Sequence, residues 1–307
     1  MPVRSRRTLT PIPIPTILPF WVALIACVPQ TGAVQPAAGP ALWQVGDEDT
    51  TLFLFGLPNL MDADTGWRNA AFDSAVSRAD AVILEADRSS AEAASAMQRV
   101  AQEVGVFRDG RTLADVLSAD VRARAGAVAA SLGVPLQALD PLKPWLAANQ
   151  LQAVALRRAG LTDPRTPAAL IVEAAAEAGK PITYLEEPTT LLTAIGGLPE
   201  ASQLRMFRQT LDIIETDPGQ AREILSLWAA GDVNRLADAF HGEGEWVDET
   251  VRTVMLLERN AAWQARLEEI LETETGVYFV AVGIGHLVGD DSLVAALEAA
   301  GYGVLRR

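Results

Sequence analysis

Cysteine and histidine are scarce in this sequence, which contains one cysteine and two histidines in 307 residues. A disulfide framework and a thiolate zinc site both need several cysteines, so both are excluded. The sequence also lacks the Gly-x-Ser-x-Gly elbow of serine hydrolases and the Gly-x-Gly-x-x-Gly phosphate loop of dinucleotide-binding proteins. These two classes of enzyme are therefore excluded as well.

Basic residues are outnumbered by acidic ones. The chain has 25 Lys and Arg against 39 Asp and Glu, which gives a net charge of −14 at pH 7. An acidic surface repels phosphate backbones and is not attracted to anionic lipid headgroups. We therefore expect no nucleic-acid partner, and a membrane contact only through a lipid anchor.

Long apolar runs are missing near the amino terminus. The apolar stretch at residues 17–26 is about ten residues long, too short to span a bilayer. It follows Arg4, Arg6 and Arg7, and no acidic residue precedes it. A basic segment followed by a short apolar one is typical of a signal peptide, which we place at residues 1–27.

The only cysteine, Cys27, lies at the end of this segment. It follows Leu24-Ile25-Ala26, which looks like the lipobox of bacterial lipoproteins, where the cysteine is lipidated and becomes the mature terminus. Thr31-Gly32-Ala33 is a competing site for ordinary cleavage, which would remove Cys27 and leave a soluble protein. Residues 28–40 are rich in proline, glycine and alanine, and we expect them to form a flexible linker.

The clearest folding unit is at the carboxyl end of the chain. The apolar, β-branched residues 277–282 predict a buried strand. Gly283-Ile284-Gly285-His286 forms a Gly-x-x-His turn after it, and Asp290 or Asp291 is expected to cap the next helix. Residues 302–305 predict a closing strand. The expected buried face of the helix consists of Leu293, Ala296, Leu297 and Ala300.

An earlier stretch repeats this plan. Residues 51–55 predict a strand, Gly56-Leu57-Pro58-Asn59 takes the place of Gly-x-x-His, and residues 81–84 predict the second strand. Glu85 follows that strand, just as Glu186 follows the predicted strand at 181–185. The expected face of the intervening helix consists of Phe72, Ala75, Val76 and Ala79.

The remaining segments are mostly helical in pattern. Residues 88–165 predict a helical insertion, and residues 188–275 predict further helices, including one at 251–271. The expected fold class is therefore α/β (mixed α+β). Its central mixed sheet is built from repeated β-loop-α-β units and surrounded by helical insertions.

Several of these motifs, in this order, resemble one known family. They are ALWQVGDEDTTLFLFG (41–56), VILEAD (82–87), LWAAGD (227–232), LLERNAAW (256–263) and FVAVGIGHLVG (279–289). Together they resemble the TraB/GumN family, which is similar to the Tiki membrane-associated proteases and to PrgY. The resemblance covers residues 41–307 and departs from the family at Asn59, where the family has histidine.

The resemblance implies a divalent metal site at the strand ends. His286, Glu85 and Asn59 are the expected metal ligands, and manganese, cobalt and zinc are the candidate ions. An amide oxygen is a far poorer ligand than imidazole for zinc or cobalt, so Asn59 should weaken the site. The site could be weakened, rebuilt around another donor, or degenerate. His241 matches no motif of the family, and we expect an ordinary exposed residue at a helix end.

The resemblance also implies two catalytic residues. Glu186, rather than Glu187, aligns with the family's Leu-Glu step and is expected to serve as general base. Arg259 matches an Arg-Asn pair of the family and could stabilise an oxyanion or hold a carboxylate ligand. Glu85 could alternatively be a strand-end acid that pairs with Arg88.

Two functions follow as expectations. The first is a protein secreted across the inner membrane, periplasmic or lipid-anchored, that resembles a metal-dependent peptide hydrolase. The second is a non-catalytic binding or accessory protein on the same scaffold. Because the GumN branch takes its name from a polysaccharide-production gene cluster, this second role could lie in the export or assembly of envelope polysaccharide.

Overall fold

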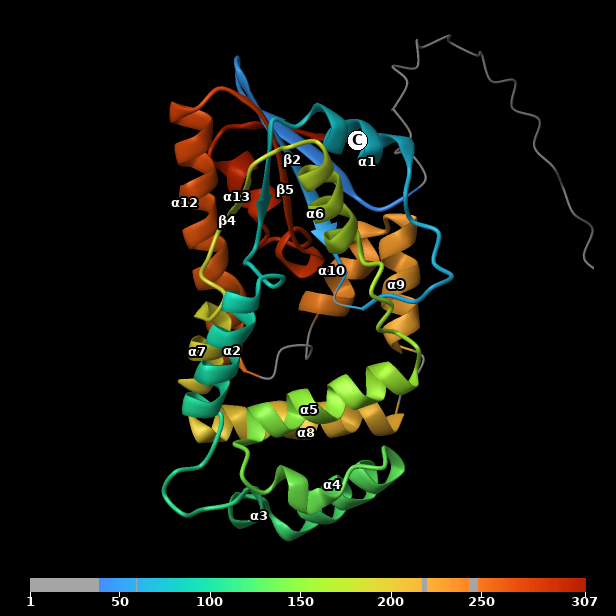
Figure 1. Cartoon of the computed structure of the whole chain (residues 1–307), viewed down its shortest axis with the longest axis vertical. Coiled ribbons are helices and arrows are strands. Elements are labelled where there is room, and N and C mark those ends of the chain that lie inside the picture. The colour runs from blue at the N-terminus through green and yellow to red at the C-terminus, as the bar shows by residue number, and fades with distance from the viewer. Residues whose placement is uncertain (1–38, 59, 217–219, 243–247) are drawn as a thin grey trace, which may run out of the picture. The chain divides into compact units, whose positions relative to one another are not determined.

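The computed structural model describes residues 39–58, 60–216, 220–242 and 248–307 (Figure 1). The predicted signal peptide with Cys27, and the linker up to residue 38, lie outside these residues. In the described part, six strands form one sheet in the order β4-β3-β5-β2-β1-β6. The strands are β1 (Leu42–Gly46), β2 (Thr50–Leu57), β3 (Ala81–Leu84), β4 (Ile182–Tyr184), β5 (Gly276–Gly283) and β6 (Gly303–Arg306).

The sheet is mixed and mostly parallel. β1 pairs antiparallel with both of its neighbours, β2 and β6, whereas β2, β5, β3 and β4 pair in parallel. The β1–β2 pair is a hairpin with a short polar loop between its strands. The α/β class with a central mixed sheet, predicted from the sequence, is confirmed.

The two repeat units start on neighbouring strands. β2 and β5 lie side by side in parallel, and Gly56 pairs with Val282 and Leu57 with Gly283. A Cβ atom on Gly56 would lie 3.0 Å from Ile284 Cβ and 3.1 Å from its Cα. Gly56 therefore allows the two turns to meet. Asn59 lies just beyond β2 and outside the described residues.

Aromatic side chains fill one face of this sheet. Rings of β2, β5, α1 (Ala70–Arg78), α9 (Gln220–Ala230) and the segment just before α1 lie with their centroids 5.0 to 6.3 Å apart. Such rings contribute a large share of core burial. The indole Nε1 of Trp228 donates to the Gly56 carbonyl over 2.8 Å, which ties α9 to the first repeat. The rings belong to Phe55, Trp67, Phe72, Trp228 and Phe279.

Helix α13 (Leu293–Ala299) follows the second turn as predicted, but its capping residue differs. The Ser292 hydroxyl accepts the Ala295 N–H over 3.1 Å, so Ser292 is the N-cap instead of Asp290 or Asp291. Ser292 directly precedes the first helical residue, where a short hydroxyl reaches the free N–H groups. The Asp291 side chain instead pairs with Arg252.

A second layer of helices builds its own core. Helix α8 packs against α5 and α4, with the buried side chains of Phe207 and Leu211 between them, and Figure 1 shows α4 on the side away from the sheet. None of the described helices is long and apolar enough to cross a membrane. The α-helices between residues 91 and 216 are α2 (Ala91–Val104), α3 (Leu113–Val116), α4 (Ala119–Ser131), α5 (Pro144–Arg158), α6 (Pro167–Glu177), α7 (Thr190–Gly196) and α8 (Glu200–Thr216).

The helix predicted at 251–271 is interrupted by a π-helical turn. Its parts are α11 (Glu249–Arg252), the π turn η2 (Thr253–Leu257) and α12 (Glu258–Thr273). No proline or glycine marks this turn in the sequence, so the pattern gave no sign of it. Arg259 is the second residue of α12, directly after the wide turn. Short π segments occur frequently at functional sites.

Candidate functional site at the strand ends

Three of the predicted site residues meet at one edge of the sheet. Glu85 follows β3, Glu186 follows β4, and His286 ends the turn after β5. These strands are parallel neighbours, so their carboxyl ends meet at the edge where open α/β sheets place ligands. The Glu186 N–H donates to the Glu85 carbonyl over 2.9 Å, which extends the pairing to the two acids. Asn59 lies outside the described residues.

Arg259 joins these three side chains. Its Nε and Nη2 bind the two carboxylate oxygens of Glu186 over 2.9 and 2.8 Å. Nη2 also donates to Glu85 Oε1 over 2.6 Å, and Nη1 lies 3.0 Å from His286 Nε2. A bidentate arginine–carboxylate pair is among the stronger hydrogen-bonded contacts in proteins. With Asn260, which binds His286, these residues form what we call the strand-end cluster.

Every N–H bond of the Arg259 guanidinium has an acceptor. A guanidinium has five such donors, and Nη1 gives its second proton to the Met255 carbonyl over 3.2 Å. The side chain is only 8% exposed, and those of Glu85 and Glu186 are 13% and 8% exposed. The guanidinium also lies over the Trp263 ring, with Cζ 4.5 Å from the centroid. Arg259 is therefore held from all sides and has no donor to spare.

The charges of the cluster hold one another ionised. Burial works to raise the pKa of the Glu85 carboxyl, but the positive charges of Arg259 and Arg88 outweigh it and keep the pKa below its usual value. Burial likewise works to lower the pKa of Arg259, and Glu186 and Glu85 raise it instead. Arg88 Nη2 also binds Glu85 Oε1, over 2.7 Å. Glu85 thus has both the Arg88 partner expected as an alternative and a place in the cluster.

His286 is neutral, and its contacts identify the tautomer. Arg259 can only donate, so His286 Nε2 must accept, and Nδ1–H then donates to Asn260 Oδ1 over 2.7 Å. The amide nitrogen of Asn260 in turn donates to the Asp291 carbonyl over 2.8 Å. Burial, followed by the charge of Arg259, lowers the pKa of His286 to about 3. The imidazole is thus fixed at both nitrogens.

The chain was compared with models of known protein families. The model of the TraB/PrgY/gumN family matches residues 41–306. The chain belongs to the TraB/PrgY/gumN family. The resemblance carried by the motifs at residues 41–56, 82–87 and 279–289 is thereby confirmed. No curated protein and no solved structure matches the chain.

The described donors do not fit the divalent ion that the family resemblance implies. An ion must reach carboxylate oxygens and an imidazole lone pair at about 2.0 to 2.2 Å. Here Glu85 Oε1, both oxygens of Glu186 and His286 Nε2 are all engaged by Arg259. Among residues 39–58, 60–216, 220–242 and 248–307, no group of three or more His, Cys, Asp or Glu side chains is arranged to hold a metal ion.

The expected catalytic roles meet the same obstacle. Glu186 accepts from Arg259 with both oxygens, and a general base needs a free oxygen facing its substrate. Arg259 would have to give up one of its five contacts before it could donate to an oxyanion. In this arrangement the cluster is closed by contacts among its own side chains.

Two contributors to this site were underestimated from the sequence. Asn260 and Trp263 stand in the LLERNAAW motif, yet only the structure shows that Asn260 orients His286 and that the Trp263 ring centroid lies 4.5 Å from the His286 ring. His241, expected to be exposed, is half-buried at the end of α10 (Val233–His241), and its Nε2 lies 2.8 Å from the Gly285 carbonyl. It thus contacts the Gly-x-x-His turn.

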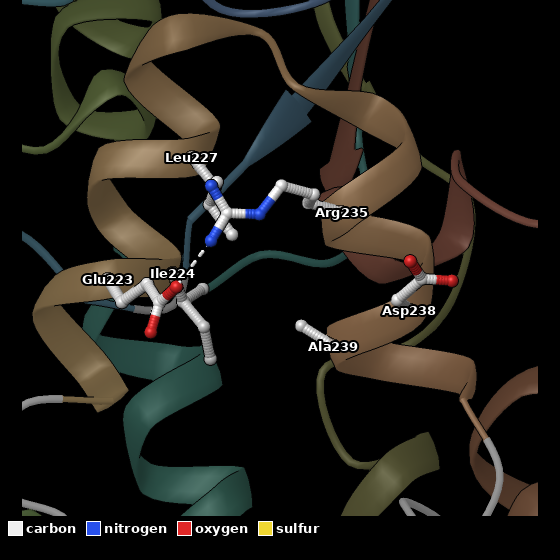
Figure 2. A pocket seen from close by; sticks show the side chains of 6 residues that line it. All are labelled: Glu223, Ile224, Leu227, Arg235, Asp238 and Ala239. Carbon is white, nitrogen blue, oxygen red and sulfur yellow. Dashed lines mark hydrogen bonds and ion pairs between the residues drawn. The ribbon is translucent and has the colours of Figure 1, made fainter. Parts of the chain in front are cut away.

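A small pocket lies apart from the cluster, between α9 and α10. Its volume is about 270 Å³, and Figure 2 shows Arg235 reaching across to Glu223, a contact of 2.6 Å, with Ile224 and Leu227 nearby. This volume falls below the range typical of pockets for small-molecule ligands. The Glu223–Arg235 pair is well exposed, so the pocket lacks the buried polar groups that distinguish the strand-end cluster.

Proposed function

We propose that this member of the TraB/PrgY/gumN family is a non-catalytic binding or accessory protein of the cell envelope. One observation carries the proposal: four of the five donors of Arg259 bind the side chains that would otherwise hold a metal or a substrate, and the fifth binds the Met255 carbonyl. A hydrolase needs a base and an electrophilic donor that can both reach the substrate. Here the described residues of the cluster satisfy one another.

The envelope location rests on the amino-terminal sequence. A basic segment, a short apolar stretch and Cys27 support secretion across the inner membrane, followed by lipidation or by cleavage after Ala33. The partner would be a peptide or a component of envelope polysaccharide export or assembly. The acidic surface argues against nucleic acid.

The location can be tested through Cys27. If Cys27 is lipidated, the mature protein should sediment with membranes, and Cys27→Ser should release it or block processing, because two acyl chains give stable membrane binding. Mass spectrometry of the mature amino terminus would measure this directly. A mature terminus at Val34 without lipid would exclude the anchor and leave a soluble envelope protein.

A metal-dependent peptide hydrolase is the second candidate function. It is favoured by the convergence of Glu85, Glu186 and His286, because an unprotonated imidazole beside carboxylates is the donor chemistry that a divalent ion selects. In that case His286, Glu85 and Asn59 would hold manganese, cobalt or zinc, which would supply an activated water. Arg259 would first have to leave these ligands.

The two functions predict different results for purified protein. After dialysis against manganese, cobalt or zinc, we expect well under one metal ion per chain by elemental analysis, and no peptidase activity that a chelator abolishes. One tightly held ion per chain, lost in His286→Ala, together with chelator-sensitive peptide hydrolysis, would refute the non-catalytic proposal.

A further inference from the structure

The strand-end cluster contains more buried negative charge than an apolar core tolerates without a cation. Glu85 and Glu186 are both mostly buried and are brought together by the pairing of β3 with β4. Two carboxylates in such a position repel each other, and each loses hydration. Some cation must therefore stand between them, and the Arg259 guanidinium occupies that position.

Arg259 is held there by its own helix as well as by the acids. Met255 is four residues before it and accepts from Nη1, and Trp263 is four residues after it and stacks on the guanidinium. Neither contact depends on Glu85 or Glu186. The cation is therefore positioned in advance, and its contacts within the helix would persist if another ion approached the acids.

We propose that Arg259 is the resident cation of the strand-end cluster, and that Arg259 and a divalent metal ion exclude each other at this site. This inference rests on the proposed non-catalytic function and extends it. The chain keeps a latent metal site whose ligands are neutralised by a side chain. Arg259 and an ion would need the same lone pairs on Glu85, Glu186 and His286, and their positive charges would repel at short range.

Removing the guanidinium should uncover the latent site. Arg259→Met keeps an apolar stem over Trp263 but removes the charge, and we expect its affinity for Mn²⁺ or Zn²⁺ to rise at least roughly 100-fold over wild type. Isothermal titration calorimetry with each metal salt would measure the change. The melting temperature of the variant should also rise with metal concentration, because an ion that binds only the folded state stabilises it.

Two matched variants separate the charge from other effects. Arg259→Lys keeps the positive charge and should bind no more metal than wild type. Arg266→Met makes the same change on the same helix, at an exposed arginine that pairs with Glu269, and should also leave metal binding unchanged. If Arg266→Met gained as much affinity as Arg259→Met, the effect would not belong to the cluster, and the proposal would fail.

A second variant, Arg259→Gln, tests the same proposal if Arg259→Met does not fold. Arg259→Gln keeps an amide donor near Glu186 and should likewise gain melting temperature with Mn²⁺ or Zn²⁺. If neither variant binds Mn²⁺ or Zn²⁺ more tightly than wild type, and neither has a higher melting temperature when the metal is present, the exclusion model is wrong. Tight metal binding by wild type with Arg259 present would overturn it as well.

The outcomes also distinguish this inference from the proposed function. Chelator-sensitive peptidase activity in wild type would refute the non-catalytic function directly. An inactive, metal-free wild type whose Arg259→Met variant still binds no metal would leave that function standing and refute only the latent site.

Discussion

The neutral state of His286 makes the stability of this protein depend on pH. Burial, followed by the charge of Arg259, lowers its folded pKa to about 3, whereas an unperturbed histidine titrates near 6.5. At a pH between these two values, His286 is protonated in the unfolded chain and neutral in the folded chain. Stability from this group is complete above the unfolded pKa and is lost as the pH falls from about 6.5 toward about 3.

The magnitude follows from the size of this window. One pKa unit corresponds to 1.36 kcal/mol, so acidification from about pH 7 to about pH 4.5 crosses roughly two units below the unfolded pKa and should cost on the order of 3 kcal/mol. That is a large part of the typical 5 to 15 kcal/mol of total stability. The cost arises first because a charged imidazole would be buried away from water, and second because a protonated Nε2 would face the Arg259 guanidinium at 3.0 Å.

Urea unfolding at the two pH values, for wild type and His286→Gln, would measure this loss. On acidification, His286→Gln should lose roughly 3 kcal/mol less stability than wild type. The contributions of carboxylates present in both proteins cancel in this comparison. The chain offers a matched control, since His241 is the only other histidine. His241→Gln should retain most of the wild-type pH dependence. A His286→Gln variant that loses as much as wild type would refute the buried neutral imidazole.

Three further predictions concern packing and charge, each measured by urea unfolding. Gly56→Ala should destabilise the fold by about 1 to 3 kcal/mol, because the new methyl group would overlap Ile284; an unchanged midpoint would contradict the close contact of the two turns. Trp228→Phe should cost about 1 to 3 kcal/mol, because it removes the indole donor to the Gly56 carbonyl; a neutral effect would mean that this bond contributes nothing. Arg259→Met should cost roughly 3 to 5 kcal/mol against at most about 1 for the exposed Arg266→Met; equal costs would rule out a buried ion pair.

Much of the sheet could be predicted from the sequence because its signals are local. The apolar run at 277–282 and the following glycine describe β5 and its turn, and the same pattern at 51–56 describes β2. These two similar strands lie side by side in the sheet as the parallel β2–β5 pair. The alternation of side chains and the positions of glycines are patterns between residues close in the sequence. A single sequence is therefore enough to predict these strands and turns.

The site was only partly predictable because its decisive contacts join distant segments. Spacing placed Glu85, Glu186 and His286 at strand ends, and the resemblance singled out Arg259. Neither indicated that Arg259 would bind all three at once, since that depends on how α12 lies against the strand ends. The N-cap was misassigned because Asp290, Asp291 and Ser292 are all good caps, and only the contact between the Ser292 hydroxyl and the Ala295 N–H distinguishes them.

The π turn η2 has a consequence for the phase of the helix that carries Arg259. An α-helix advances about 100° per residue, so one additional residue in a wide turn rotates everything after it by about that angle. Before the turn, Val251 faces the core of Trp145 and Leu146; after it, Trp263 faces the main core and Arg259 faces the acids. The π turn allows one continuous helix to direct Val251 toward one hydrophobic core and Arg259 toward the acids, although the two lie in different directions. The direction of the Arg259 side chain is therefore set by the number of residues in the π turn, which also contains Met255, an acceptor of Arg259.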